Sequence, residues 1–186
     1  RTFWAVQIGE GIGSCGVLDG ELARGALGHA GEIGHTTVDR HGRRCACGAV
    51  GCWETIASLR WLRREARERG LRGARNVTVE RLTDLVGSGD RVATGLLDAY
   101  AENIAVGLTN LIHVVAPALI VLQGAVADGG DVLLQRINHH VARRALAGAD
   151  HGATILMSEL GTDARLLGAG ALVMSSTATA TTTAEP

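Results

Sequence analysis

The chain contains 186 residues, of which 46% are hydrophobic and 20% are charged, and this composition is typical of a globular protein with a single core. No stretch of about 18 apolar residues is present, and the first residues lack the apolar segment of a secretory signal, so we expect no membrane partner. The net charge is −1, whereas a nucleic-acid-binding domain normally has an excess of basic residues, so we do not expect this chain to bind DNA directly.

The beginning of the chain is expected to form an antiparallel meander. Strands are predicted over residues 3–8, 14–18 and 21–24, and an Asp19-Gly20 turn joins the last two. The glycine-rich turn at residues 9–13 joins the first two. Such a turn can cradle a phosphate through its backbone N–H groups, but Glu10 would repel a phosphate at close range. A tight hairpin is therefore the favoured interpretation, with phosphate binding as the alternative.

The segment from Glu32 to Glu54 places three of the four cysteines close to a histidine. Its candidate metal ligands are His35, Cys45, Cys47 and Cys52. Zn²⁺ takes four nitrogen and sulfur ligands in a closed tetrahedral site. This clustering favours a metal site in a reducing compartment over a disulfide framework, and we expect the chain to be cytoplasmic.

The remainder of the chain is predicted to alternate helices and strands. Helices are predicted over residues 53–69, 77–86, 90–115, 131–146 and 163–174, with strands over residues 118–122 and 153–158. The alternation implies right-handed crossovers and parallel strands, so we expect an α/β fold in which a mixed sheet carries the helices. Residues 175–186 are almost entirely Ser, Thr and Ala and are expected to be disordered.

Arginine is concentrated in the segment from Leu59 to Asn76. Its arginines are Arg60, Arg63, Arg64, Arg67, Arg69, Arg72 and Arg75. Glu65 and Glu68 are interleaved with them at helical spacing, so the segment is interpreted as a solvated, ion-paired face of a helix.

The cysteine-rich segment carries a resemblance to a known family. Gly31-Glu32-Ile33-Gly34-His35 is followed by Cys45-Ala46-Cys47-Gly48-Ala49-Val50-Gly51-Cys52-Trp53-Glu54. This pattern resembles the signature of the ROK family, named for its repressors, open reading frames and kinases, and the likeness covers nearly the whole chain before the tail. It implies an actin-like ATPase, ribonuclease-H-like fold of two lobes. Residues 1–174 resemble the C-terminal lobe, with a zinc knuckle inserted at residues 32–54.

The same resemblance implies what lies beyond this chain and what it binds. The N-terminal lobe, and in the regulator branch a helix-turn-helix that binds operator DNA, would lie outside the chain. The helix over residues 163–174 would pack on the N-terminal lobe, and we expect a homo-oligomer. The ligand of the family is a sugar or a sugar phosphate.

The resemblance also implies roles for individual residues. His35, Cys45, Cys47 and Cys52 are the implied zinc ligands, and Glu32, His35 and Glu54 are the implied sugar contacts. Carboxylates accept strong hydrogen bonds from hydroxyl groups, and an imidazole can bind zinc with one nitrogen while the other contacts the sugar or an orienting acceptor. The alternative is that zinc only holds a glycine-rich loop together, with Glu32 and Glu54 as solvated carboxylates.

Two departures from the kinase pattern favour a regulator. ROK kinases usually have Gly-Thr-Gly-Ile-Gly where this chain has Glu10 in the second position, which places a negative charge where the phosphates of ATP would lie. The family's Gly-Gly-Gly-Val becomes Gln123-Gly124-Ala125-Val126, whose side chains should crowd the nucleotide. We therefore expect a sugar-sensing, zinc-binding domain of a ROK transcriptional regulator with no catalytic residues. An ATP-dependent hexose kinase is the main alternative, and a module retained only for protein association is the third.

Overall fold

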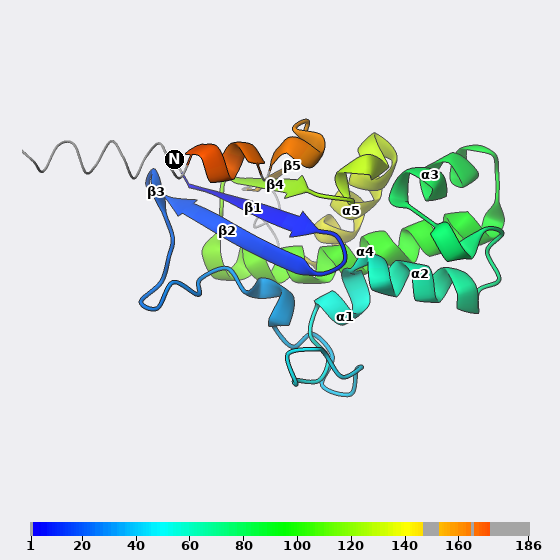
Figure 1. The fold of residues 1–186 in the computed structure, drawn as a ribbon, viewed down its shortest axis with the longest axis horizontal. Coiled ribbons are helices and arrows are strands. Elements are labelled where there is room, and N and C mark those ends of the chain that lie inside the picture. Colours follow the sequence, from blue (N-terminus) through cyan, green and yellow to red (C-terminus); the bar gives the residue numbers. More distant parts are fainter. Residues whose placement is uncertain (1, 147–152, 165, 172–186) are drawn as a thin grey trace, which may run out of the picture.

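The computed structural model describes residues 2–146, 153–164 and 166–171, and in this part of the chain five strands form one mixed sheet in the order β3-β2-β1-β4-β5 (Figure 1). The strands are β1 (Phe3–Ile8), β2 (Ile12–Leu18), β3 (Glu21–Leu22), β4 (Leu119–Gln123) and β5 (Thr154–Met157). The first three are antiparallel, whereas β4 is parallel to both β1 and β5. The predicted mixed sheet is confirmed, although the third strand is two residues long rather than four.

Alternation of side chains along the central strands builds the core. Trp4, Val6 and Ile8 of β1 are buried, and so are Ile120 and Leu122 of β4. Successive side chains of a strand point to opposite faces, so each strand contributes every second residue to the same hydrophobic cluster. The long helix α4 (Arg91–Val115) runs along the sheet in Figure 1, and twelve of its residues are buried.

The described helices carry the rest of the architecture. They are α1 (Glu54–Ala57), α2 (Leu59–Glu68), α3 (Val79–Gly87), α4 (Arg91–Val115) and α5 (Gly130–Arg144), with short 3₁₀ helices η1 (Ile33–His35), η2 (Ala74–Asn76), η3 (Ala127–Gly129) and η5 (Gly161–Asp163). Among them, none combines the length and the hydropathy that crossing a bilayer requires. α4 packs against both α3 and α5.

The prediction of a single helix over residues 53–69 is wrong in one respect, because the chain forms two helices there, α1 and α2, with a break at Ser58. Ser58 has an extended backbone with φ −89° and ψ 167°, and its side chain accepts a hydrogen bond from the N–H of Trp61 at the start of α2. The break leaves the N–H of Leu59 free to donate to the carbonyl oxygen of Gly9 over 2.8 Å. α2 is therefore tied directly to the glycine-rich turn between β1 and β2.

The helices predicted to begin at residues 77, 90 and 131 begin at Val79, Arg91 and Gly130, within two residues of the predicted starts. Thr78 caps α3 by accepting from the N–H of Arg81, and Asp90 caps α4 by accepting from the N–H of Ala93. The spacing after Gly129-Gly130 predicts Asp131 as the cap of α5, and this is wrong, because α5 begins at Gly130 and has no side-chain cap. Residues 164 and 166–171 are helical, in agreement with the last predicted helix. Residues 172–174 and the predicted disordered tail at 175–186 lie outside the described residues.

Candidate metal and sugar site

The loop between η1 and α1 folds back on itself as a compact knuckle. Two isolated β-bridges, Thr37 with Cys52 and Arg44 with Val50, hold its two sides together. At its tip the N–H of Cys45 donates to the carbonyl oxygen of Ala49 over 2.8 Å. Gly51 is required near the base, because its φ is +72° and a Cβ there would overlap the carbonyl oxygen of Asp39.

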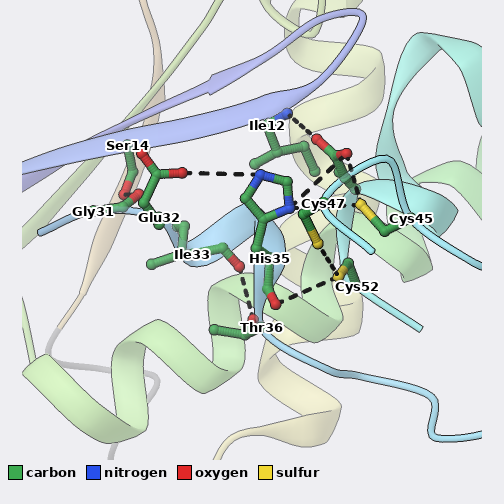
Figure 2. Close-up of polar contacts among 11 residues, drawn as sticks. Ile12, Ser14, Gly31, Glu32, Ile33, His35, Thr36, Cys45, Cys47 and Cys52 are labelled. Carbon is green, nitrogen blue, oxygen red and sulfur yellow. Dashed lines mark hydrogen bonds and ion pairs between the residues drawn. The ribbon is translucent and has the colours of Figure 1, made fainter. Parts of the chain in front are cut away.

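The knuckle brings four candidate metal ligands together. They are His35, Cys45, Cys47 and Cys52, and their ligand atoms all lie within 4.8 Å of one another. Figure 2 shows the pairs, with Cys45 Sγ 3.6 Å from His35 Nδ1 and Cys47 Sγ 3.6 Å from Cys52 Sγ. Tetrahedral zinc with Zn–S bonds of about 2.3 Å requires neighbouring ligand atoms about 3.8 Å apart. The cluster could therefore hold a metal ion, and its donor set fits a closed tetrahedral site.

The three thiols of the cluster differ in their electrostatic environment. Burial raises the pKa of the Cys45 thiol to about 12, and burial also raises the pKa of Cys52. Cys47 is exposed, and its pKa is lowered, mainly by a hydrogen bond from the backbone of Ala49. A metal cation would replace the thiol protons, since the thiolate is the metal-binding form.

Two carboxylates flank the imidazole of His35 on opposite sides. Glu54, the first residue of α1, places Oε1 4.0 Å from Nδ1. Glu32 places Oε2 3.9 Å from Nε2 (Figure 2). Glu54 is the more enclosed, with 15% of its side chain exposed, and its Oε2 accepts from the N–H of Ile12 over 3.4 Å. Glu32 is 65% exposed. The structure thus brings the three predicted sugar contacts together beside the metal ligands, and their role in sugar binding stays a prediction.

A cleft of about 590 Å³ extends from Glu54 across the edge of the sheet. It is lined by the glycine-rich turn at residues 9–13, the segment at residues 123–125, and the side chains of Glu54 and Asp128. We call it the carboxylate-lined cleft, because Glu10, Glu54 and Asp128 line it whereas no lysine or arginine does among the described residues. Sequence reasoning missed Asp128. Its place just after a parallel strand, where ligand sites of α/β sheets gather, could have indicated it.

Glu10 is not the free negative charge that the sequence led us to expect. Its carboxylate is hydrogen-bonded to Arg63 of α2, and its Oε2 lies 3.9 Å from Nε of Arg60. Two guanidinium groups therefore offset its charge, so repulsion of a phosphate by Glu10 is weaker than an unpaired carboxylate would produce. The ion pair is half-exposed and is further screened by water.

Comparison with known proteins identifies two kinds of relative. The chain is 29% identical over 168 residues to the xylose repressor of Bacillus spizizenii, covering 90% of this chain and 43% of the repressor. It is 32% identical over 185 residues to the glucokinase of Halalkalibacterium halodurans, covering 93% of this chain and 56% of that enzyme. The chain thus spans about half the length of the curated relatives that it matches.

A solved structure agrees with the fold. The ROK family glucokinase of Streptomyces griseus, in complex with glucose and AMPPNP, superposes with a TM-score of 0.81 and 29% identity. The superposition covers 92% of this chain and 60% of that one, which confirms the predicted actin-like ATPase fold with a single mixed sheet. The model of the ROK family matches residues 1–176, so the chain belongs to the ROK family.

Proposed function

We propose that this chain is the sugar-sensing, zinc-binding effector domain of a ROK transcriptional regulator. The observation that carries the proposal is the convergence of Glu32, His35 and Glu54 next to a cluster of four metal ligands. A xylose repressor among the relatives and a glucose complex among the similar structures support sugar binding by this site. Sugar hydroxyl groups would donate to the two carboxylates, which accept two or more hydrogen bonds each.

The proposed zinc ion has a structural role. When bound by His35, Cys45, Cys47 and Cys52, it would supply a cross-link between η1 and the knuckle with no coordination position left for a substrate. His35 would then be fixed with Nδ1 toward the cluster and Nε2 toward Glu32, as the distances of 3.6 Å and 3.9 Å indicate. A fixed imidazole presents its second nitrogen to a sugar hydroxyl or to an orienting carboxylate. Cysteines that bind a metal and form no disulfide are typical of the reducing cytoplasm.

The carboxylate-lined cleft favours a regulator over a kinase. Phosphoryl transfer depends on cations that stabilise the charge of the transferred group, whereas Asp128 supplies the opposite charge in the cleft and Glu10 supplies a negative charge that Arg60 and Arg63 partly offset. Arg60 and Arg63 contact Glu10 from α2, but neither guanidinium lines the cleft. Gln123 and Ala125, in place of glycines, also line it and reduce the space for a nucleotide.

An ATP-dependent hexose kinase of the same family is the second candidate. Its support is the identity of 32% to a glucokinase and the likeness to a glucokinase that holds glucose and AMPPNP. In a regulator, the sugar must bind with different affinity to the DNA-bound and DNA-free states, because only such a difference couples the two sites. The DNA contact would be made by a helix-turn-helix outside this chain, in a homo-oligomer.

The test uses the full-length protein that contains this chain. We expect glucose or xylose to change its affinity for operator DNA, and we expect no ATP-dependent phosphorylation of either sugar in a coupled assay. DNA binding would be followed by fluorescence anisotropy with and without sugar. Turnover of a sugar with ATP at an ordinary enzymatic rate, with no effect of sugar on DNA binding, would establish the kinase instead.

A further inference from the structure

A second cavity lies between the knuckle and α2, next to the candidate sugar site. Its volume is about 140 Å³, well above the roughly 15 Å³ that a single water requires. Four arginines line it, namely Arg43 and Arg44 from the knuckle and Arg60 and Arg64 from α2. We call this cavity the arginine pocket. Glu54 lines both the arginine pocket and the carboxylate-lined cleft, so the two spaces meet at that residue.

Within the described part of the chain, three of the four guanidinium groups of the arginine pocket form long ion pairs, and none is within hydrogen-bond distance of a carboxylate. The nearest acidic oxygens are 3.7 Å from Arg43 and 3.9 Å from Arg64, both on Glu68, and 3.9 Å from Arg60, on Glu10. Nε of Arg64 is buried and has no hydrogen-bond partner among the described residues, since Oε1 of Glu68 is 3.9 Å away. A buried guanidinium donor without a partner is unfavourable. The pocket therefore has donors available for an anion.

The two carboxylates that line the arginine pocket do not neutralise it. Glu10 is hydrogen-bonded to Arg63, which lies outside the lining, and Glu54 accepts from the N–H of Ile12 and from the thiol of Cys45. Four arginines thus line the cavity with two carboxylates, and the partial partner of Arg43 and Arg64, Glu68, lies outside the lining. Burial lowers the pKa of Arg64 and the charge of Arg43 lowers it further, whereas Glu68 and Glu65 raise it.

The arginine-rich segment therefore divides into two parts. Arg63 and Arg69 form the ion pairs that helical spacing and turn contacts provide, with Glu10 and Glu65. Arg60 and Arg64 form longer ion pairs of 3.9 Å, and they also line the cavity that Arg43 and Arg44 line from the knuckle. Arginine presents planar, forked donors that match phosphate oxygens.

We propose that the arginine pocket binds the phosphate group of a sugar phosphate whose sugar ring contacts Glu54. The sugar half of this inference rests on the proposed function, whereas the phosphate half depends only on the four arginines. An effector of this kind would contact the knuckle and α2 at once. It would link the metal-bearing loop to the helix that is bonded to Gly9 of the glycine-rich turn.

Orthophosphate is the first probe, titrated calorimetrically into the zinc-loaded full-length protein. Arg64→Gln and Arg44→Gln should each weaken its binding by about tenfold or more, the effect of losing one charge-assisted hydrogen bond. Arg72→Gln is the matched control, since Arg72 is exposed and lies outside the pocket. Arg44 is exposed, so its substitution tests the proposal even if the Arg64 variant fails to fold. Equal weakening by the Arg72 control, or no binding of orthophosphate, would overturn the proposal.

A second set of titrations distinguishes free phosphate from the phosphate group of a sugar phosphate as the ligand. The ligands are glucose, glucose 1-phosphate and glucose 6-phosphate. At least one of the sugar phosphates should bind about tenfold tighter than glucose, and Arg44→Gln should abolish that difference. If glucose binds and neither phosphate binds more tightly, the proposal fails while the proposed function stands. If no sugar binds but orthophosphate does, the pocket is a site for free phosphate and the sugar phosphate is excluded. Arginine-dependent binding of random-sequence duplex DNA without binding of orthophosphate would assign the pocket to DNA backbone contact and overturn the proposal.

Discussion

The thiol of Cys45 donates to Oε1 of Glu54 over 3.1 Å, so the candidate metal cluster and the candidate sugar site share a hydrogen bond. Glu54 begins α1 immediately after the last residues of the knuckle, and its second oxygen accepts from the N–H of Ile12 in β2. One carboxylate therefore joins the knuckle, the sheet and the cleft. Loss of the Cys45 thiol proton would remove this hydrogen bond to Glu54, the residue proposed to contact the sugar.

Glu54→Gln should weaken sugar binding and leave the metal content unchanged. The amide keeps the shape of the carboxylate but loses its charge, and a hydrogen bond to a charged group contributes about 1.5–3 kcal/mol, or at least about tenfold in affinity. Calorimetric titration of glucose and xylose measures the effect. Glu80→Gln on the exposed face of α3 serves as the control and should bind as the unaltered protein does. Unchanged affinity in the Glu54 variant would remove Glu54 from the sugar site.

Cys47→Ser should abolish stoichiometric zinc binding. We expect close to one zinc per chain in the purified protein, and serine cannot supply the thiolate that the fourth ligand position requires. Elemental analysis by mass spectrometry measures the metal. Cys15→Ser is the control, because Cys15 lies on β2 and does not belong to the cluster. Retention of full zinc by the Cys47 variant would contradict the ligand set.

The zinc-free protein should lose stability as pH rises above about 9. Burial raises the pKa of Cys45 from 9.0 to about 12, so the folded state holds the thiol proton more tightly than the unfolded chain does. The resulting stabilisation is complete below the unfolded pKa and is lost as pH rises through the folded value. Thermal melting in the presence of a chelator measures this loss, which Cys45→Ser should reduce.

The affinity for zinc should have the opposite pH dependence and should increase as pH rises. The ligands of zinc must be thiolates, so binding releases protons and the affinity rises with pH, by up to about tenfold per pH unit for each proton released. Competition titrations against a chelator of known affinity measure the slope. An affinity for zinc that did not change with pH would contradict thiol ligation.

The sequence indicated the local features of the fold well. The helix predicted over residues 90–115, observed as α4, depends on residues that are neighbours along the chain, so spacing alone was sufficient to predict it. The clustering of His35 with the three cysteines followed from the motif, because a short glycine-containing loop leaves few ways to place them.

The features that spacing could not predict depend on contacts between distant residues. The break at Ser58 accompanies a bond from Leu59 to Gly9, and the pairing of Glu10 with Arg63 joins residues 53 positions apart. The arginine pocket likewise needs the knuckle to fold back over α2 before Arg43 and Arg44 can meet Arg60 and Arg64. Charge in a motif can therefore be interpreted only when its partners are known.

Gly51→Ala should disrupt the knuckle more than Gly48→Ala does. Both glycines have a positive φ, +72° and +96°, which costs an L-residue roughly 1–2 kcal/mol. A Cβ at Gly48 meets no atom within 4 Å, whereas a Cβ at Gly51 overlaps the carbonyl oxygen of Asp39, so only the second change forces the two sides of the loop apart. The N–H of Val38 also donates to the carbonyl oxygen of Gly51 over 2.8 Å, and this bond would be strained.

The measurement is zinc affinity by chelator competition together with the melting temperature of both variants. Because the conformational cost is common to the two, the difference between them isolates the overlap at Gly51. We expect Gly51→Ala to bind zinc at least about tenfold more weakly than Gly48→Ala, as an added loss of about 1.4 kcal/mol would produce. Equal zinc affinities would mean that the backbone around Asp39 can shift without moving His35 and the cysteines, and that the base of the knuckle does not fix its ligands.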